Sequence, residues 1–126
     1  LAAAFAAASF SVLPQLAVAE SQTIPILKAD LQGMEGMVAN VIMLDVDPGW
    51  QTPNHIHPGQ LILYVLEGEV VLDVEGRDTM TVKAGEAIYE TPNVPMVGRN
   101  ISATDRAKLL IFQVGEADAP IMVAQE

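Results

Sequence analysis

From Gln22 onward the chain alternates short apolar runs with turns rich in Gly, Pro, Asn and Asp, and none of these runs follows a helical period. Short runs that are closely spaced by turns are typical of a β-sandwich or a small β-barrel. The expected strands are residues 37–46, 61–66, 70–74, 79–83, 87–90, 97–101 and 107–114. We therefore predict an all-β domain with no linker that divides it.

The expected strand 37–46 is apolar on both of its faces. Successive side chains of a strand point to opposite sides, so a strand of this kind is covered twice. One face is expected in the lumen of a barrel, and the other under a second sheet or a neighbouring subunit.

Composition limits the choice of partner. The chain has 126 residues, of which 51% are hydrophobic and 17% charged, which suits one domain with one core and disfavours disorder. Sixteen acidic residues against six basic ones give a net charge of −10, which repels phosphate backbones and anionic lipids. Nucleic acid and membrane surfaces are therefore not expected partners. The lack of cysteine removes disulfides, thiolate metal sites and a cysteine nucleophile.

Residues 1–19 form an uncharged apolar stretch that ends in Ala17-Val18-Ala19. Small residues at positions 17 and 19 fit the cleavage pattern of a secretory signal, which would leave a mature domain of residues 20–126. We therefore expect a periplasmic or secreted protein. The alternative is an Ala-rich helix that packs on the domain or on a neighbouring chain.

His55 and His57 are the only two histidines of the chain. On an extended strand, residues two apart point to the same side, so both imidazoles would face one compartment. Two neutral imidazoles side by side make half of a transition-metal site. The pair could equally bond to each other, to a carbonyl group or to water.

Two blocks of residues carry a family resemblance. The first contains Gly49, His55-Ile56-His57 and Tyr64-Val65-Leu66-Glu67-Gly68, and the second contains Gly85-Glu86, Pro92-Asn93-Val94-Pro95 and Asn100. In these residues the chain resembles the cupin superfamily over residues 36–115. The resemblance implies a double-stranded β-helix, or jelly-roll barrel, that usually dimerises through a strand-rich face, so a homodimer is expected.

The same resemblance implies metal ligands, of which this chain keeps only some. Metal-binding cupins usually supply two histidines and a glutamate from the first block and a histidine from the second. His55 and His57 match, whereas Leu61, with Gln60 beside it, and Met96 occupy the other two positions. Manganese and ferrous iron prefer oxygen and imidazole ligands, so their affinity should fall, while the Met96 thioether suits copper.

Two acidic side chains are candidate substitutes for the missing carboxylate. Glu90 and Glu67 could each point inward, but a buried unpaired carboxylate is costly, so both are expected at the rim or in solvent. Gln60 is expected on the opposite side of its strand from His57, unless Gly59 bulges the strand.

Three functions are compatible with these residues. The first, which we favour, is binding of a small molecule in the lumen, with His55 and His57 as a polar corner and with weak or partial metal binding. Its expected ligand-binding residues are His55, His57, Gln60, Leu61 and Met96. The second is a metal-dependent enzyme of the dioxygenase or isomerase kind, whose catalytic residues the sequence does not assign. The third is a copper protein that uses His55, His57 and Met96. Zinc, copper, nickel, manganese and iron are not distinguished, and no metal at all is equally compatible.

Overall fold

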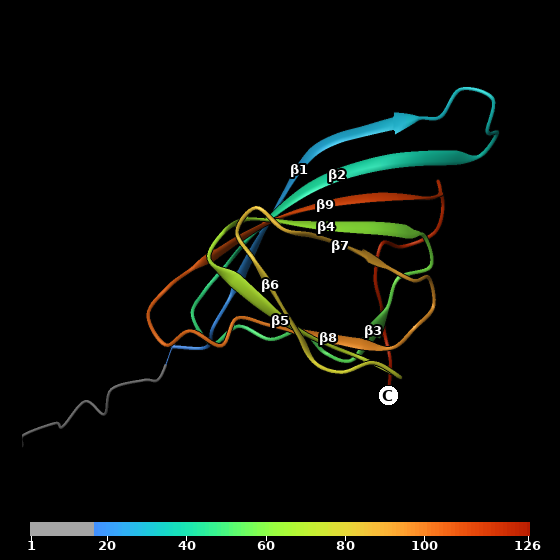
Figure 1. The fold of residues 1–126 in the computed structure, drawn as a ribbon. Helices are drawn as coiled ribbons and strands as arrows, with labels where there is room; N and C mark the ends of the chain where they lie inside the picture. The colour runs from blue at the N-terminus through green and yellow to red at the C-terminus, as the bar shows by residue number, and fades with distance from the viewer. Residues whose placement is uncertain (1–16) are drawn as a thin grey trace, which may run out of the picture.

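The computed structural model describes residues 17–126, which contain ten strands and no helix (Figure 1). The strands form two five-stranded sheets, whose neighbouring strands pair antiparallel. The first sheet has the order β1 (Ser21–Asp30), β2 (Met37–Val46), β9 (Ala107–Glu116), β4 (Gln60–Glu67) and β7 (Ala87–Glu90). The second has the order β10 (Val123–Ala124), β3 (His55–Ile56), β8 (Met96–Arg99), β5 (Glu69–Val74) and β6 (Met80–Lys83). The all-β prediction is confirmed.

The seven expected strands are present with limits that agree within two residues, whereas β1, β3 and β10 are not among the expected strands. One limit differs for a clear reason. The strand expected at residues 97–101 ends at Arg99. Asn100 is buried, and its side-chain amide donates to the carbonyl groups of Asp47, at 3.1 Å, and Asp105, at 2.8 Å. These bonds hold the turn that follows β8, so the strand cannot continue through Asn100.

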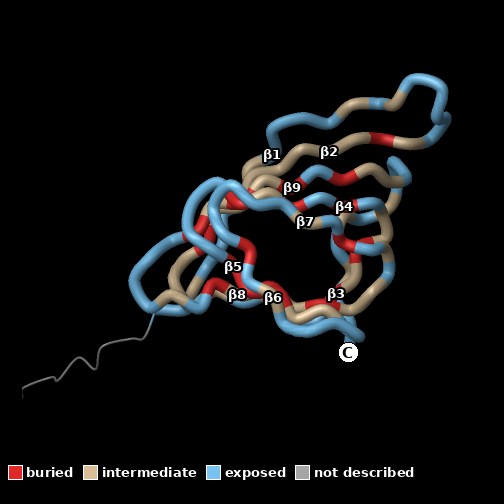
Figure 2. The backbone as a smooth tube through the Cα atoms, in the orientation of Figure 1, coloured by how far each residue is buried: buried red, intermediate tan, exposed pale blue. Residues whose placement is uncertain are grey.

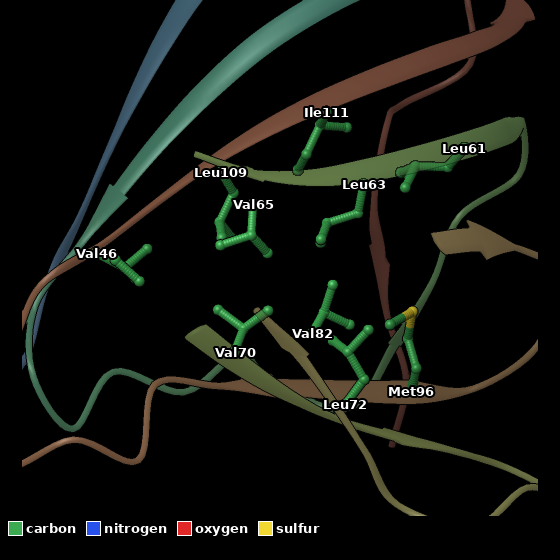
Figure 3. Packing of buried hydrophobic residues seen from close by; sticks show 11 residues of the cluster. Val46, Leu61, Leu63, Val65, Val70, Leu72, Val82, Met96, Leu109 and Ile111 are labelled. Carbon is green, nitrogen blue, oxygen red and sulfur yellow. The ribbon is translucent and has the colours of Figure 1, made fainter. Parts of the chain in front are cut away.

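The core lies between the two sheets. Alternate residues of β4, Leu61, Leu63 and Val65, point inward, as the period of two along a strand requires. Figure 3 shows them facing Val70, Leu72 and Val82 of the second sheet. At one end of this space the packing is complete, because Val46, Val65 and Ala107 are all 0% exposed.

The first sheet is more exposed towards its β1 edge. Figure 1 shows the β1–β2 hairpin continuing beyond the other strands, and Figure 2 shows β1 as mostly exposed or half-buried. β2 is half-buried along most of its length because one of its neighbours is this edge strand. The sequence pattern predicts that residues 37–46 are buried on both faces, and within one chain they are not.

Most of the predicted signal segment, residues 1–16, lies outside the described residues. Ala17, Val18 and Ala19 have no regular secondary structure, and Val18 is 82% exposed. Among residues 17–126, no helix has the length and apolar character needed to cross a bilayer.

Candidate functional site

The two histidines lie together at one end of the space between the sheets. His55 belongs to β3 and pairs with Met96 of β8, and His57 follows β3 directly. Both are buried, with exposed fractions of 3% and 7%. Their Nε2 atoms are 3.1 Å apart, and the two rings meet edge to face. The backbone amide of Asn93 donates to the carbonyl of His57 at 2.9 Å, so the Pro-rich bend fixes this part of the chain.

The second nitrogen of each ring fixes its tautomer. His55 Nδ1 is 2.9 Å from the carbonyl oxygen of Pro53, and His57 Nδ1 is 2.7 Å from that of Ile121. A carbonyl oxygen only accepts, so each Nδ1 must carry the proton and donate. Burial lowers the pKa of both imidazoles, which favours their neutral forms. Both Nε2 atoms are therefore unprotonated, and their lone pairs face the same small region between the two rings.

Glu90 corrects our expectation of a carboxylate at the rim or in solvent. It is only 5% exposed, and its Oε2 lies 3.4 Å from His57 Nε2. Among the described residues this oxygen has no hydrogen-bond partner, and burial raises the pKa of Glu90 to about 7. Along β7, Ala87 and Tyr89 are exposed while Glu90 is buried, so strand alternation was the signal that could have placed it inside.

The position of Glu90 relates directly to the missing ligand. In the strand register, Glu90 of β7 lies opposite Leu61 of β4, the residue at the glutamate position. β7 therefore supplies a carboxylate next to the position at which metal-binding cupins have a glutamate and this chain has Leu61.

These groups border a cavity of about 350 Å³ with mainly apolar walls. The single Trp of the chain, Trp50, forms part of the wall, and Thr23 and Thr52 add hydroxyl groups. Its lining also includes Ile42, Leu44, Leu63, Val70, Leu72, Leu109, Ile111, Ile121 and Met122. A volume of this size holds a small organic molecule, since pockets for such ligands begin at about 300 Å³.

The structure brings together three of the five predicted ligand-binding residues. His55, His57 and Met96 all line the cavity, and Figure 3 shows Met96 extending from β8 toward the opposite sheet. Leu61 is 1% exposed and packs in the core without lining the cavity. Gln60 points outward, where its side chain accepts a hydrogen bond from the Tyr89 hydroxyl, as alternation predicts in the absence of a bulge at Gly59.

The residues present fit a transition-metal ion in part. Ligating histidines usually donate their other ring nitrogen to a carbonyl or carboxylate group, as His55 and His57 do here. Within residues 17–126, however, no group of three or more His, Cys, Asp or Glu side chains is arranged to hold an ion. Glu90 contacts His57 without completing such a set, so the pair offers two nitrogen ligands and other groups would have to supply the rest.

No sequence pattern indicates the C-terminal part of the site. Ile121 and Met122 line the cavity, and the Ile121 carbonyl accepts from His57, which is 64 positions away in the chain. Neither residue belongs to a motif, so only the path of the folded chain reveals their contribution.

Comparison with known families identifies the fold. A cupin domain model matches residues 42–112, more than half of the 126 residues, and the chain belongs to this family. The predicted cupin fold is thereby confirmed. A search of curated proteins gives no match.

Solved structures support the same fold. An uncharacterised conserved protein with a double-stranded β-helix domain from Klebsiella pneumoniae is similar, with a TM-score of 0.64 and 20% identity over 91% of this chain and 86% of that one. The DMSP lyase DddQ from Ruegeria pomeroyi has a TM-score of 0.62 and 20% identity over 69% of this chain, which spans 43% of the lyase. An oxalate oxidase in complex with glycolate has a TM-score of 0.61 and 21% identity over 82% of this chain and 54% of the oxidase. At these identities the likeness establishes the fold alone.

Proposed function

We propose that this cupin binds a small organic molecule in its lumen, with the polar corner formed by His55, His57 and Glu90 holding the head of the ligand. One observation carries the proposal: at the wall of an apolar cavity, two unprotonated Nε2 atoms meet a Glu90 oxygen that has no hydrogen-bond partner within residues 17–126. Buried acceptors without donors are costly, so the corner is stabilised by a group that brings donors or positive charge.

This chemistry defines the class of ligand. The corner favours a head group that donates hydrogen bonds, such as an amine or a hydroxyl, and disfavours a carboxylate. The walls formed by Leu63, Leu72 and Ile111 favour an apolar body. An apolar cavity of about 150 Å³ accommodates benzene, so a cavity of about 350 Å³ suits a ligand of roughly twice that size.

A metal ion satisfies the same acceptors and is the second part of the proposal. His55 and His57 would hold it through their Nε2 atoms, with Glu90 close by and water available to complete the coordination. A bound divalent ion acts as a Lewis acid for oxygen or nitrogen groups of a ligand. Met96 lines the cavity beside His55, and retention of copper in preference to zinc, nickel, manganese or iron would point to its thioether.

Matched ligands test the head-group chemistry, with Trp50 as the probe. Straight-chain amines, alcohols and carboxylates of equal length are added to chelator-treated protein while Trp50 fluorescence is followed. We expect the amine and the alcohol to bind and the carboxylate not to bind. After saturation with zinc, the carboxylate should bind as well, because a zinc ion held at the polar corner attracts the oxygen atoms of the carboxylate. Absence of binding by all three, with and without zinc, would contradict the proposal.

An enzyme is the second candidate function, and Glu90 is the observation that favours it. A buried carboxyl group with a pKa of about 7, beside a neutral imidazole, is suited to general acid–base chemistry near neutral pH. This would agree with a metal-dependent dioxygenase or isomerase. Oxygen uptake and isomerisation assays of the metal-loaded protein, with Glu90→Gln as the inactive control, would test it.

We also propose that a second copy of the chain covers the outer face of the first sheet. One row across all five strands, Leu27, Val41, Phe112, Ile62 and Tyr89, contains no charged residue, and four of the five are exposed. In a chain with a net charge of −10, this uncharged row lets two copies meet with little repulsion. Light scattering should give a dimer, and Phe112→Glu should give a monomer that keeps its lumen site.

Export with cleavage after Ala19 is a further part of the proposal. The Glu20 backbone nitrogen donates to Asp47 Oδ2 at 3.0 Å, so cleavage there would place a new ammonium group next to a carboxylate. Val18, two residues before the proposed mature start at Glu20, is itself exposed. Intact-mass measurement of protein secreted by a bacterial host should give a chain that starts at Glu20, and retention of residues 17–19 would contradict the proposal.

A further inference from the structure

The chain that follows β9 crosses from one sheet to the other over the polar corner. After β9 ends at Glu116, the amide of Ala119 donates to the Glu116 carbonyl at 3.1 Å and forms a turn. β10 then pairs with β3, so that Ala124 lies opposite His55. We call residues 117–125 the strap.

The strap bonds to one side chain of the polar corner, through a single carbonyl group. The Ile121 carbonyl accepts from His57 Nδ1 at 2.7 Å and from Gln113 Nε2 at 3.4 Å. Gln113 is 4% exposed, so this oxygen serves two buried side chains. The side chains of Ile121 and Met122 also form part of the cavity wall.

The strap is held less firmly than the core. None of its residues is fully buried, and Met122 is 43% exposed. Its pairing with the second sheet consists of the two-residue β10, followed by a 2.8 Å bond from the Gln125 amide to the Asn54 carbonyl. Segments with few buried contacts open at lower free energy than core strands.

We propose that the strap is a positioning element of the lumen site, in which the Ile121 carbonyl locks His57 with a proton on Nδ1 and a bare Nε2. The inference rests on the proposed function, because it concerns how that site is prepared for a cation or a donor. When the strap leaves, Nδ1 loses its acceptor, and the neutral ring is free to carry its proton on Nε2 instead. In that form Nε2 can neither accept nor bind a metal.

The strap thereby couples two events. Its departure removes part of the cavity wall and at the same time releases the tautomer of His57. The ring of His55 is held by another segment, because its Nδ1 donates to the Pro53 carbonyl, and only the backbone of His55 pairs with the strap, opposite Ala124. His55 is therefore an internal reference within the same site.

The test uses a chain truncated after Pro120, with Ile121→Ala as the matched control that keeps the carbonyl group. Nitrogen NMR of labelled imidazoles reports the tautomers, and calorimetry with zinc ions alone reports affinity. In the truncated chain we expect His57 to show a mixture of tautomers, His55 to stay unchanged and the zinc affinity to fall at least ten-fold. Ile121→Ala keeps the carbonyl group, so His57 should show the wild-type tautomer in this variant.

Unchanged His57 tautomer and zinc affinity in the truncated chain would overturn the inference. If circular dichroism shows that the truncated chain does not fold, the double variant Val123→Pro/Ala124→Pro replaces it in the test. This variant removes the backbone amides of β10 and keeps the chain length. If wild-type protein binds neither zinc nor the amine, the proposed function fails, while the tautomer comparison still decides the role of the strap.

Discussion

At one end of the space between the sheets, Val46, Val65 and Ala107 are 0% exposed, while at the other His55, His57 and Glu90 border a cavity of about 350 Å³. The first end buries apolar groups completely, which is the main source of folding stability. The second end buries three polar side chains and, in the described part of the chain, leaves the Glu90 Oε2 without a hydrogen-bond partner, which costs stability. One end therefore holds the fold together, and the other carries the proposed ligand site.

Leu61→Ala should have the largest effect on stability. Leu61 is 1% exposed in the packed core and does not line the cavity, so its truncation leaves a void of its own. We expect the free energy of unfolding to fall by about 2–5 kcal/mol, as measured by urea denaturation. The tautomers of His55 and His57 should not change, and loss of the polar corner in a still-folded variant would show that the two ends are coupled.

Glu90→Gln should change how stability depends on pH in chelator-treated protein. Burial raises the folded pKa of Glu90 from 4.5 to about 7, so its protonated form is stable in the fold and stability is lost as pH rises from about 5 to above 7. The shift corresponds to at most about 3 kcal/mol. His55 and His57, with lowered pKa values, act in the opposite sense and lose stability as pH falls through and below 6.5.

Urea denaturation at several pH values measures this dependence. The histidines contribute equally to both proteins, so the stability of the wild type relative to Glu90→Gln should decline as pH rises above 5. A difference that does not change with pH would mean that Glu90 is solvated in solution and that the corner is more open than the structure shows.

His57→Ala should separate function from stability at the same end. Removing one of the two Nε2 atoms that would bind the metal should weaken zinc binding at least ten-fold, which is about 1.4 kcal/mol. Stability should change less than in Leu61→Ala, because the site borders a cavity and not a filled core. Calorimetry and urea denaturation measure the two quantities, and a collapsed fold would show that His57 is structural.

Gln60→Ala should have the smallest effect. Gln60 is exposed, and its bond to the Tyr89 hydroxyl lies on the outer face. We expect a change in stability within about 0.5 kcal/mol and no change in the binding of zinc or the amine. A loss of ligand affinity would restore Gln60 as a binding residue and contradict the strand register.

The fold and half of the site could be predicted from the sequence. Strand alternation and turn residues gave most strands, and the His55-Ile56-His57 spacing placed both imidazoles on one side of the chain. The prediction for Glu90 is wrong because the alternation along β7 turns its side chain inward despite the general cost of burying a carboxylate. At the proposed ligand site, the strand period is the better guide.

The sequence by itself determined the family, the alternation that fills the core and the pair of imidazoles, because these depend on spacing along the chain. Tertiary structure alone decided that Glu90 lies opposite Leu61 and that the Ile121 carbonyl fixes the proton of His57. Both contacts join segments that are far apart in the chain. Their distances are set by sheet register and by the path of the strap, which no local pattern encodes.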